Sequence, residues 1–323
     1  AHDYLAEFKR DVLDFYDCFT VGEGPRMEPE VALSYVREGK DKVLDMMINF
    51  AHMEADCFIT DFLQRPFDLV KLKKAFTKWQ TKMYGKGWNA LYMENHDHPR
   101  IISRYGSEKY RVESGKSIAA SYLFQRGTPF VYQGQEIGMI NTPLPSLDDY
   151  KDIMVKNNAR IARSLGLSKE TVLRLAQKAS RDNARTCMQW SGAPNAGFTN
   201  GKPWFVVNSN YKDINVESQL GDPGSILNFY RNALQFRRDN PVVIYGDYVE
   251  HMPKSKELYV YERNLAGKKL LVICSYSEKC VRFDAPEGIT LDETKQVFGN
   301  YDNNFVISNG FTTRPYEMRV YLF

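Results

Sequence analysis

The sequence predicts an α/β fold of parallel β/α units, followed by a small antiparallel all-β domain. Up to about residue 132, short apolar runs alternate with segments of helical periodicity, and polar or charged residues follow each apolar run. This alternation is typical of a parallel sheet, and four such runs are half of an eight-stranded barrel. After residue 244, several short runs separated by turn residues follow one another, which is typical of an antiparallel domain.

The elements of the first part follow from the spacing of apolar residues. Helical spacing predicts helices over 3–17, 68–84 and 110–126. Apolar runs predict strands at 18–21, within 42–57, at 88–93 and at 128–132. Polar residues lie just past these strand ends, and the carboxyl edge of parallel strands is where barrel enzymes place their chemistry. We therefore expect a site along that edge.

A long insertion interrupts the alternation over about 140–222. It is polar, rich in Asn, Gly and Pro, and has helix-like pieces at 146–162 and 168–179. Connections of this length are usually functional. An amphipathic helix at 225–238, which Pro241 follows, ends this part. We expect a barrel domain over 1–243 and an antiparallel β domain over 244–323, with strands at 245–249, 257–261, 269–275 and 316–323.

Composition and charge exclude several classes of protein. The net charge is +3 and the charges are interspersed, so the sequence lacks the basic stripe of a nucleic-acid binder. No run of about 18 apolar residues is present, so we expect no membrane-spanning helix. Aromatic residues make up 13% of the chain, a share that fits either a sugar-binding cleft or a large core.

The five cysteines favour neither a metal site nor a disulfide framework, because they are scattered and form no Cys-x-x-Cys pair. Cys18 and Cys274 lie in apolar, strand-like runs and are expected to be buried free thiols. Free thiols suit a reducing compartment, so we expect a cytoplasmic protein without a bound metal.

Three polar segments stand where a barrel enzyme would place its site. Glu23 follows the run FTVG and is either a general acid or a solvated loop glutamate. His96 and Asp97 end the third strand, either as ligands of sugar hydroxyls or as an Asx-capped turn. Arg181 and Arg185 belong either to a carbohydrate platform or to a surface loop with local salt bridges. Glycoside hydrolysis needs a pair of carboxylates across a cleft. This requirement connects the three segments.

Four long motifs carry a family resemblance. In chain order they are FTVGEGPRM, WNALYMENHDHPRIISRYG, GTPFVYQGQEIGM and RDNARTCMQWSGAPNAGFTNGKPWFVVNSNYKDINV. The chain resembles the C-terminal part of the oligo-1,6-glucosidase and α-glucosidase group of the α-amylase superfamily. The resemblance implies the second half of a (β/α)8 catalytic barrel, followed by a small antiparallel domain. It also implies retaining hydrolysis of α-1,6 or α-1,4 glucosidic bonds at the non-reducing end of short oligosaccharides, without a cofactor.

The resemblance assigns roles residue by residue. Glu23 matches the family's acid/base, and Asp97 matches the carboxylate that binds sugar hydroxyls and steadies the oxocarbenium-like transition state. His96 matches its hydroxyl-binding neighbour. Arg181 matches an arginine that contacts the sugar next to the cleaved bond, whereas Arg185 is either a substrate contact or a structural residue.

Some positions depart from the family pattern. His98 stands where Gln is usual, Gln135 where Glu is usual, Cys187 where Pro is usual, and Ala51 where Glu is usual. The changes at 98 and 135 are expected near the site and bear on linkage preference. The family's nucleophile is an Asp in a G-F-R-x-D segment on the fourth strand. No such segment occurs here, and it is expected upstream of residue 1.

These departures set expectations for the chain on its own. Without the nucleophile we expect it to be inactive or nearly so. An open half barrel exposes two strand edges, so we expect pairing with the N-terminal half of the barrel, or self-association. The implied substrate is an isomaltose-like oligosaccharide. Trehalose-6-phosphate hydrolysis, sucrose isomerisation and a non-catalytic binding or scaffold role stay open, and retention of Glu23, His96 and Asp97 argues against the last.

Overall fold

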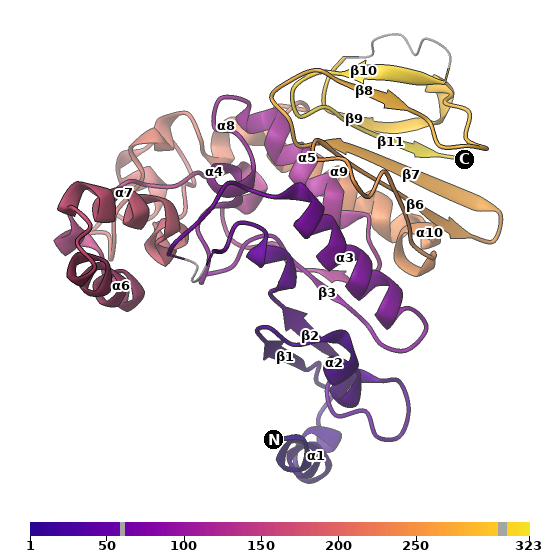
Figure 1. Ribbon diagram of the computed structural model, residues 1–323, viewed down its shortest axis with the longest axis horizontal. Coiled ribbons are helices and arrows are strands. Elements are labelled where there is room, and N and C mark those ends of the chain that lie inside the picture. The colour runs from indigo at the N-terminus through magenta and orange to yellow at the C-terminus, as the bar shows by residue number, and fades with distance from the viewer. Residues whose placement is uncertain (59–61, 303–308) are drawn as a thin grey trace.

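The computed structural model describes residues 1–58, 62–302 and 309–323, and its centre is a row of parallel strands (Figure 1). Strand β1 (Val21–Gly24) pairs in parallel with β2 (Met46–Asn49). A parallel bridge between Met47 and Asn89 joins β2 to β3 (Ala90–Leu91), which pairs in parallel with β4 (Thr128–Pro129). The spatial order equals the chain order, as successive β/α units produce.

Helices connect these strands. They are α1 (His2–Asp11) before β1, α2 (Pro29–Val36) after it, α3 (Leu69–Met83) after β2, and α4 (Ile101–Tyr105) and α5 (Arg111–Leu123) after β3. Helix α3 begins where Asp68 accepts hydrogen bonds from the amides of Val70 and Lys71. Its apolar stripe, which includes Phe76 and Trp79, is buried, so the periodicity predicted this helix correctly. Helix α2 was not predicted.

The first strand lies further along the chain than its apolar run indicated. The prediction was 18–21, but pairing begins at Val21 opposite Met46, so the strand covers Val21–Gly24 and includes Glu23. Residue Phe19 is 59% exposed, and Cys18 is exposed rather than buried. The prediction for Cys18 was therefore wrong, because an apolar run is buried only where the fold packs something against it. Cys274 is buried, as predicted.

The insertion forms a small cluster of its own. Helices α6 (Ile153–Ser164) and α7 (Lys169–Ala179) pack through Val155, Ala159, Val172 and Ala176, and a short helix α8 (Val216–Leu220) follows. The helix expected over 146–162 begins only at Ile153, because Ser146 caps a separate 3-10 turn and Asp152 caps α6. Figure 1 shows α6 and α7 at the side of the molecule away from the C-terminal strands.

The C-terminal part is antiparallel, as predicted, but several of its elements were misplaced. The five-stranded sheet has the order β5 (Val249–His251), β6 (Leu258–Leu265), β7 (Lys268–Ser275), β11 (Met318–Leu322), β9 (Gln296–Gly299), and β8 (Val281–Asp284) pairs with β10 (Gly310–Thr313). Before it lie α9 (Ile226–Asp239) and α10 (Pro241–Tyr245). Pro241 thus opens a helix, so the strand predicted at 245–249 was wrong except for its last residue. Strands β8, β9 and β10 were missed.

Helix α5 joins the two sheets. Its residues from Ser114 to Leu123 are all buried, and small residues among them, such as Gly115, Ser117 and Ala120, let the antiparallel sheet approach closely. Ser117 Oγ donates to the carbonyl of Ser275 at 2.8 Å, and Gln125 Nε2 donates to Tyr259 Oη at 3.0 Å. The main core therefore runs continuously from α3 and α5 to β6, β7 and β11. The division into domains at residues 243 and 244 stays a prediction.

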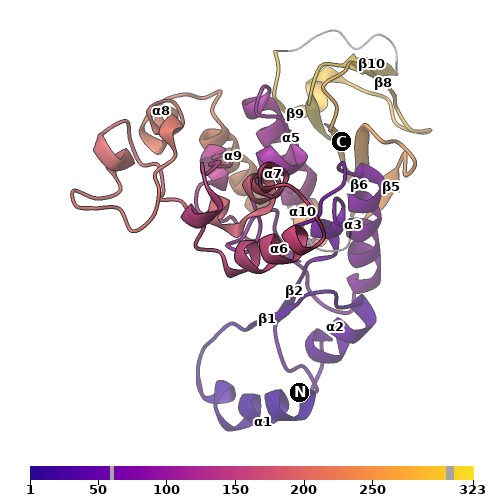
Figure 2. The ribbon, with the colours of Figure 1, turned by 60° about the vertical axis from the view of Figure 1, so that its left-hand side comes forward.

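Helix α1 and the residues just after it are not packed into this core. Helix α1 has no buried residue, and Figures 1 and 2 show it at the end of the molecule opposite the antiparallel strands. Tyr4, Phe15 and Tyr16 are 78%, 77% and 70% exposed. Among the described residues, no helix is both long enough and apolar enough to cross a membrane.

Candidate active site

The predicted site residues come from three parts of the fold that meet at the carboxyl edge of the parallel strands. Glu23 lies in β1, His96 and Asp97 lie in the loop after β3, and Arg181 and Arg185 lie in a 3-10 turn of the insertion. The insertion therefore supplies Arg181 and Arg185 to the edge that carries Glu23 and Asp97.

Asp97 is the centre of this arrangement. Its Oδ1 accepts from Arg181 Nη1 at 3.3 Å and from Arg185 Nη2 at 3.0 Å. His96 Nε2 lies 3.5 Å from Asp97 Oδ2, and the Asp97 amide donates to Asn95 Oδ1 at 2.8 Å, which fixes the turn. The Asp97 side chain remains 28% exposed. Two arginines thus anchor one oxygen, and the other lies near His96.

Arg181 is held by a residue that the sequence analysis missed. Asp152 Oδ1 accepts from Arg181 Nη2 at 2.6 Å and from Nε at 3.0 Å, and Oδ2 accepts the Arg181 amide at 3.0 Å. Burial acts to raise the pKa of Asp152, but the hydrogen bonds from Arg181 and from the Met154 amide outweigh it and lower that pKa. Asp152 also caps α6, and its sequence context signals only that cap.

Arg185 holds the loop after β3. Its Nε donates to the carbonyl oxygen of His96 at 2.9 Å while its Nη2 reaches Asp97. One guanidinium therefore connects the backbone and the side chain of adjacent residues. This geometry is that of a residue that orients Asp97, and a direct contact of Arg185 with substrate stays a prediction.

A cavity of about 250 Å³ opens beside Asp97. Its lining is partly apolar, from Pro25, Phe50, Met53 and Met154, and partly charged, from Arg26, Glu54, Asp97 and Arg181, with His98 completing it. This mixture of apolar walls and a few convergent polar groups is typical of a small-molecule site. We name it the Asp97 cavity.

Glu23 stands apart from this cavity. It is exposed and does not line the Asp97 cavity, although its neighbours Pro25 and Arg26 do. Glu23 and the end of β3 are separated by two strand spacings, roughly 10 Å. The structure thus brings His96, Asp97, Arg181 and Arg185 into contact, and it leaves Glu23 at the same edge without contacting them.

Beneath the cavity lies a buried layer that keeps two histidines neutral. His98 Nδ1 lies 3.4 Å from Arg104 Nη1, and His98 Nε2 lies 3.4 Å from Tyr92 Oη. Asp56 holds Arg104 by two hydrogen bonds of 2.6 and 2.8 Å. Burial, then the Arg104 charge, lowers the pKa of His98 well below its ordinary value. Burial lowers the pKa of His52 to about 3.

A buried ion pair ties the ends of β3 and β4 together. Arg100 Nη1 donates to Glu94 Oε2 at 2.9 Å and to the Gln133 carbonyl at 2.7 Å. The second Glu94 oxygen accepts the Ile101 amide at 2.8 Å. Both side chains are almost fully buried, and burial raises the pKa of Glu94 in spite of Arg100. The pair fixes the loop that carries His96 and Asp97.

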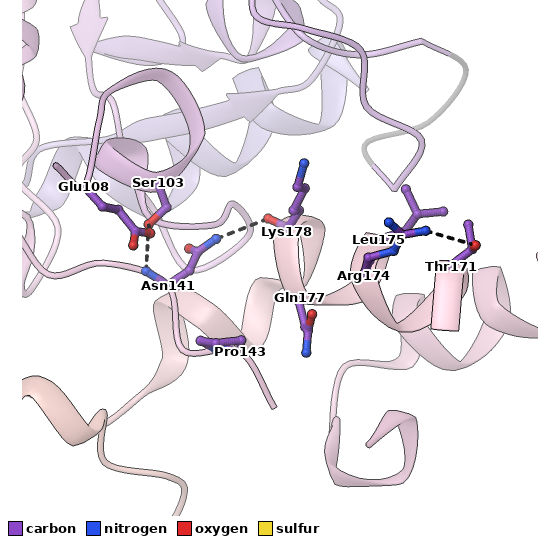
Figure 3. Close-up of a pocket in the computed structure, with 9 residues that line it drawn as sticks. All are labelled: Ser103, Glu108, Asn141, Pro143, Thr171, Arg174, Leu175, Gln177 and Lys178. Carbon is purple, nitrogen blue, oxygen red and sulfur yellow. Dashed lines mark hydrogen bonds between the residues drawn. The ribbon is translucent and has the colours of Figure 1, made fainter. Parts of the chain in front are cut away.

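Two further hollows open on the surface, one beside the site and one away from it. One, of about 560 Å³, shares His96 and Arg185 with the site and has aromatic walls from Trp190, Phe198 and Trp204. The other, of about 520 Å³, lies between α4 and α7 and contains none of the predicted site residues (Figure 3). Within the described ranges, no three His, Cys, Asp or Glu side chains are grouped to hold a metal ion.

Known proteins match the chain over almost its whole length. The family model "Alpha amylase, catalytic domain" matches residues 1–246. An oligo-1,6-glucosidase of Parageobacillus thermoglucosidasius is 40% identical over 325 residues, covering 99% of this chain and 58% of that protein. The solved trehalose-6-phosphate hydrolase of Bacillus licheniformis superposes with a TM-score of 0.92 at 39% identity, covering 99% of this chain and 59% of that one. The solved isomaltulose synthase of Protaminobacter rubrum gives a TM-score of 0.93 at 32% identity, with coverage of 99% and 58%. The chain thus spans less than two thirds of these relatives' lengths.

Proposed function

The chain belongs to the α-amylase family, and from that membership we propose that it is the second barrel half of a retaining α-glucosidase. The proposed reaction is hydrolysis of α-1,6 or α-1,4 glucosidic bonds of short oligosaccharides from the non-reducing end. A relative named oligo-1,6-glucosidase supports this reaction, and a second, named trehalose-6-phosphate hydrolase, supports the glycoside hydrolase class.

One observation carries the proposal: a partly exposed Asp97 carboxylate that two arginines hold and that lines a cavity. Two arginines hold this carboxylate in place, and a carboxylate in that position attracts the positive charge that develops on the sugar ring. His96 Nε2 lies 3.5 Å from Asp97 Oδ2 and both side chains are partly exposed, so both are available to a pair of sugar hydroxyls. Arg181 is available to the same sugar because it lines the cavity.

We assign the proton transfers to Glu23. In the first step its carboxyl group gives a proton to the departing glycosidic oxygen while a nucleophilic carboxylate forms a bond to the anomeric carbon. In the second step the Glu23 carboxylate takes a proton from water, which displaces the enzyme carboxylate from that carbon. A proton donor of this kind works best in a dry site, and Glu23 is exposed in this chain. The proposal therefore requires further chain to cover the β1 side.

Free strand edges and exposed aromatic side chains support the proposal that further chain covers the β1 side. Strands β1 and β4 are the outer strands of the parallel row, so each leaves one edge without a strand neighbour in the described residues. The exposed aromatic side chains of Tyr4, Phe15 and Tyr16 lie on the β1 side of the chain. We propose that the first half of the barrel pairs with these edges and supplies the nucleophile. Self-association is the alternative, and a clean monomer in light scattering would exclude it.

The experiment is a comparison of two preparations. The 323-residue chain alone is expected to release no measurable glucose from isomaltose or a nitrophenyl α-glucoside, and glucose release by it would overturn the half-barrel proposal. With the barrel completed by a first half, hydrolysis is expected to appear. Glu23→Gln is expected to abolish it, while Glu30→Gln, an exposed carboxylate paired with Lys82, is expected to leave it unchanged.

Three other functions remain as candidates. A relative named trehalose-6-phosphate hydrolase and another named isomaltulose synthase have the same fold, so the completed protein is to be assayed on trehalose 6-phosphate and sucrose as well. Turnover of one of these at a higher kcat/KM than isomaltose identifies that activity instead. Sugar binding without any turnover by the completed protein identifies a non-catalytic relative.

A further inference from the structure

The outward side of helix α6 carries apolar side chains that the fold leaves exposed. Ile153 and Ile161 are 59% and 53% exposed, and Leu165, just after the helix, is 73% exposed. Because these residues are spaced eight and four positions apart, they lie along one side of the helix. The opposite side is buried where α6 packs against α7. The exposed side is therefore an apolar stripe without a partner among the described residues.

Cations lie beside this stripe. Lys156, Arg160 and Arg163 are exposed and lie about one turn apart on α6, which contains no acidic residue. Residues 153–178 contain six Lys or Arg and one acidic residue, Glu170, although the net charge of the whole chain is only +3. In the described part of the chain, none of the three α6 cations forms an ion pair. Charges of one sign are thus gathered next to the apolar stripe.

Both features are unfavourable for the helix on its own. Lys156 and Arg160 are four residues apart and Arg160 and Arg163 are three apart, the spacings at which helical side chains are neighbours. Neighbouring like charges destabilise a helix, and exposed apolar side chains contribute little to its packing. Both features become favourable when the helix meets a surface that is negatively charged outside and apolar within.

Helix α6 has the dimensions of a helix that lies on a membrane rather than across it. It has 12 residues, too few for the roughly 20 that span a bilayer. An amphipathic helix with Lys and Arg beside an apolar face binds in the plane of an anionic lipid surface. Figure 1 shows α6 and α7 on the side of the molecule away from the antiparallel strands, so α6 lies at the periphery.

An exposed indole lies near the start of α6. Lys151 Nζ donates to the Trp204 carbonyl at 2.9 Å and lies 5.5 Å from the centre of the Trp204 ring. Trp204 is 57% exposed. Indole rings are enriched at membrane surfaces because one end is polar and the rest is apolar. Trp204 thus adds an interfacial group at one end of the helix.

We propose that the α6 face, formed by Ile153, Lys156, Arg160, Ile161, Arg163 and Leu165, binds the surface of an anionic lipid membrane. The apolar side chains enter the boundary between headgroups and acyl chains, and the cations meet the lipid phosphates. This contact involves the outside of the insertion, so it does not rest on the proposed hydrolysis. Met154 of the same helix lines the Asp97 cavity, so a docked protein holds that cavity near the lipid surface.

A lipid surface fits the α6 face better than a nucleic acid does. The phosphates of a nucleic acid would meet the cations but would leave Ile161 and Leu165 in water. A lipid surface accommodates both kinds of side chain. The proposal therefore requires that binding depends on the apolar side chains as well as on the cations.

Co-sedimentation of the 323-residue chain with vesicles tests the proposal. Vesicles of phosphatidylcholine alone are compared with vesicles of equal parts phosphatidylcholine and phosphatidylglycerol. The chain is expected to bind the anionic vesicles at least about tenfold tighter than the neutral ones, because the cations meet negative charge only there. Added salt is expected to weaken this binding, since exposed charges are screened.

Variants of the α6 face locate the contact. Arg160→Gln is expected to weaken binding to anionic vesicles about fivefold, the effect of one basic residue near such a surface. Ile161→Gln is expected to weaken it about three- to tenfold, because a polar side chain does not enter the bilayer. Lys74→Gln and Leu220→Gln, at exposed residues of α3 and α8, are the matched controls and are expected to change it less than about twofold. Circular dichroism checks that all four variants keep their helix content.

Equal binding to neutral and anionic vesicles, or no binding to either, would overturn the proposal. Binding by the Arg160 and Ile161 variants that matches the controls would overturn it as well. Duplex DNA that binds more tightly than anionic vesicles, with no effect of Ile161→Gln, would assign the face to nucleic acid instead.

The remaining outcomes concern other parts of the same protein. If Ile161→Gln turned a dimer into a monomer in light scattering, and neither bound vesicles, the face would belong to a second copy of the chain. Loss of vesicle binding when the first half of the barrel is added would assign the face to that half. Both results would overturn the proposal. Hydrolysis of glucosides by the completed barrel is a separate measurement that none of these results affects.

Discussion

Asp152 accepts three hydrogen bonds from Arg181, two from the guanidinium and one from the backbone amide. These bonds direct the remaining guanidinium nitrogen, Nη1, toward Asp97. The Asp152 side chain is 1% exposed, whereas Arg181 is 20% exposed and lines the Asp97 cavity. The buried residue is therefore the positioning residue, and the arginine is the one that meets the cavity.

Asp152→Asn tests this positioning. Loss of one charge-assisted hydrogen bond is expected to leave Arg181 free to turn away, which weakens sugar binding in the Asp97 cavity about tenfold. Isothermal titration with glucose or isomaltose measures the effect, and Asp148→Asn, at an exposed carboxylate nearby, is the control. An unchanged dissociation constant would show that Arg181 does not depend on Asp152.

Stability is expected to fall in mild acid because of the buried histidines. Burial lowers the pKa of His52 to about 3, against an ordinary value of about 6.5. Between these values the unfolded chain binds a proton that the native chain does not, so stability decreases as pH falls. From pH 7 to pH 5 the loss from His52 is about 2 kcal/mol. His98, whose pKa is also lowered, acts in the same direction.

His52→Phe is expected to remove that part of the pH dependence, while keeping the stacked contact with Phe76. Urea unfolding at pH 7 and pH 5 measures it. The control is His96→Gln, at an exposed imidazole, which is expected to retain the full slope. If His52→Phe lost as much stability in acid as the unchanged protein, titration of His52 would not be the cause.

The ion pair of Glu94 and Arg100 is expected to be costly to break from one side. Arg100→Met leaves the buried Glu94 carboxylate without its cation, at a cost of about 3–5 kcal/mol. Adding Glu94→Gln to that variant is expected to recover part of the loss, because a neutral amide is easier to bury. Urea midpoints of the single and double variants decide this. Arg10→Met, at an exposed arginine, is the control, and additive losses would contradict the prediction.

Lys73 connects α3 to the C-terminal strands. Its fully buried Nζ donates to the carbonyls of Met252, Ser255 and Leu258 at 2.7, 2.9 and 3.1 Å. Lys73→Met leaves these oxygens without their donor, and the free energy of unfolding is expected to fall by about 2–4 kcal/mol. Lys74→Met, at an exposed position of the same helix, is expected to cost less than about 0.5 kcal/mol. Equal losses for the two variants would contradict the role of Lys73.

The sequence predicted correctly those elements whose limits depend on their own residues rather than on a distant partner. Helix α3 has its own cap in Asp68 and its own apolar stripe, so its limits were found within a residue or so. Strand β1 was displaced because its limits depend on where β2 pairs with it, which lies outside its own sequence. The helix α10 was missed because Pro241 was placed only after the helix at 225–238, yet proline suits the first turn of a helix, and here it opens α10.

The site was predictable only in part, for a similar reason. Asp97 and Arg181 are distant in the sequence, and no periodicity connects them, so their partnership came from the family resemblance rather than from spacing. Asp152 could not be separated from an ordinary helix cap, because it performs that role as well. The exposed position of Glu23 agrees with the solvated-glutamate alternative, and the sequence could not decide it, since a strand end predicts the edge on which a residue lies and not what covers it.

The most direct test of the account replaces Glu23 in the protein with a completed barrel. Glu23→Ala is assayed on a nitrophenyl α-glucoside, whose leaving group needs little proton donation, with and without azide. If Glu23 is the acid/base, turnover stalls at the glycosyl-enzyme, and azide is expected to restore it by attacking the anomeric carbon to give α-glucosyl azide. Hydrolysis at the unchanged rate without azide, or β-glucosyl azide as the product, would contradict the assignment of Glu23.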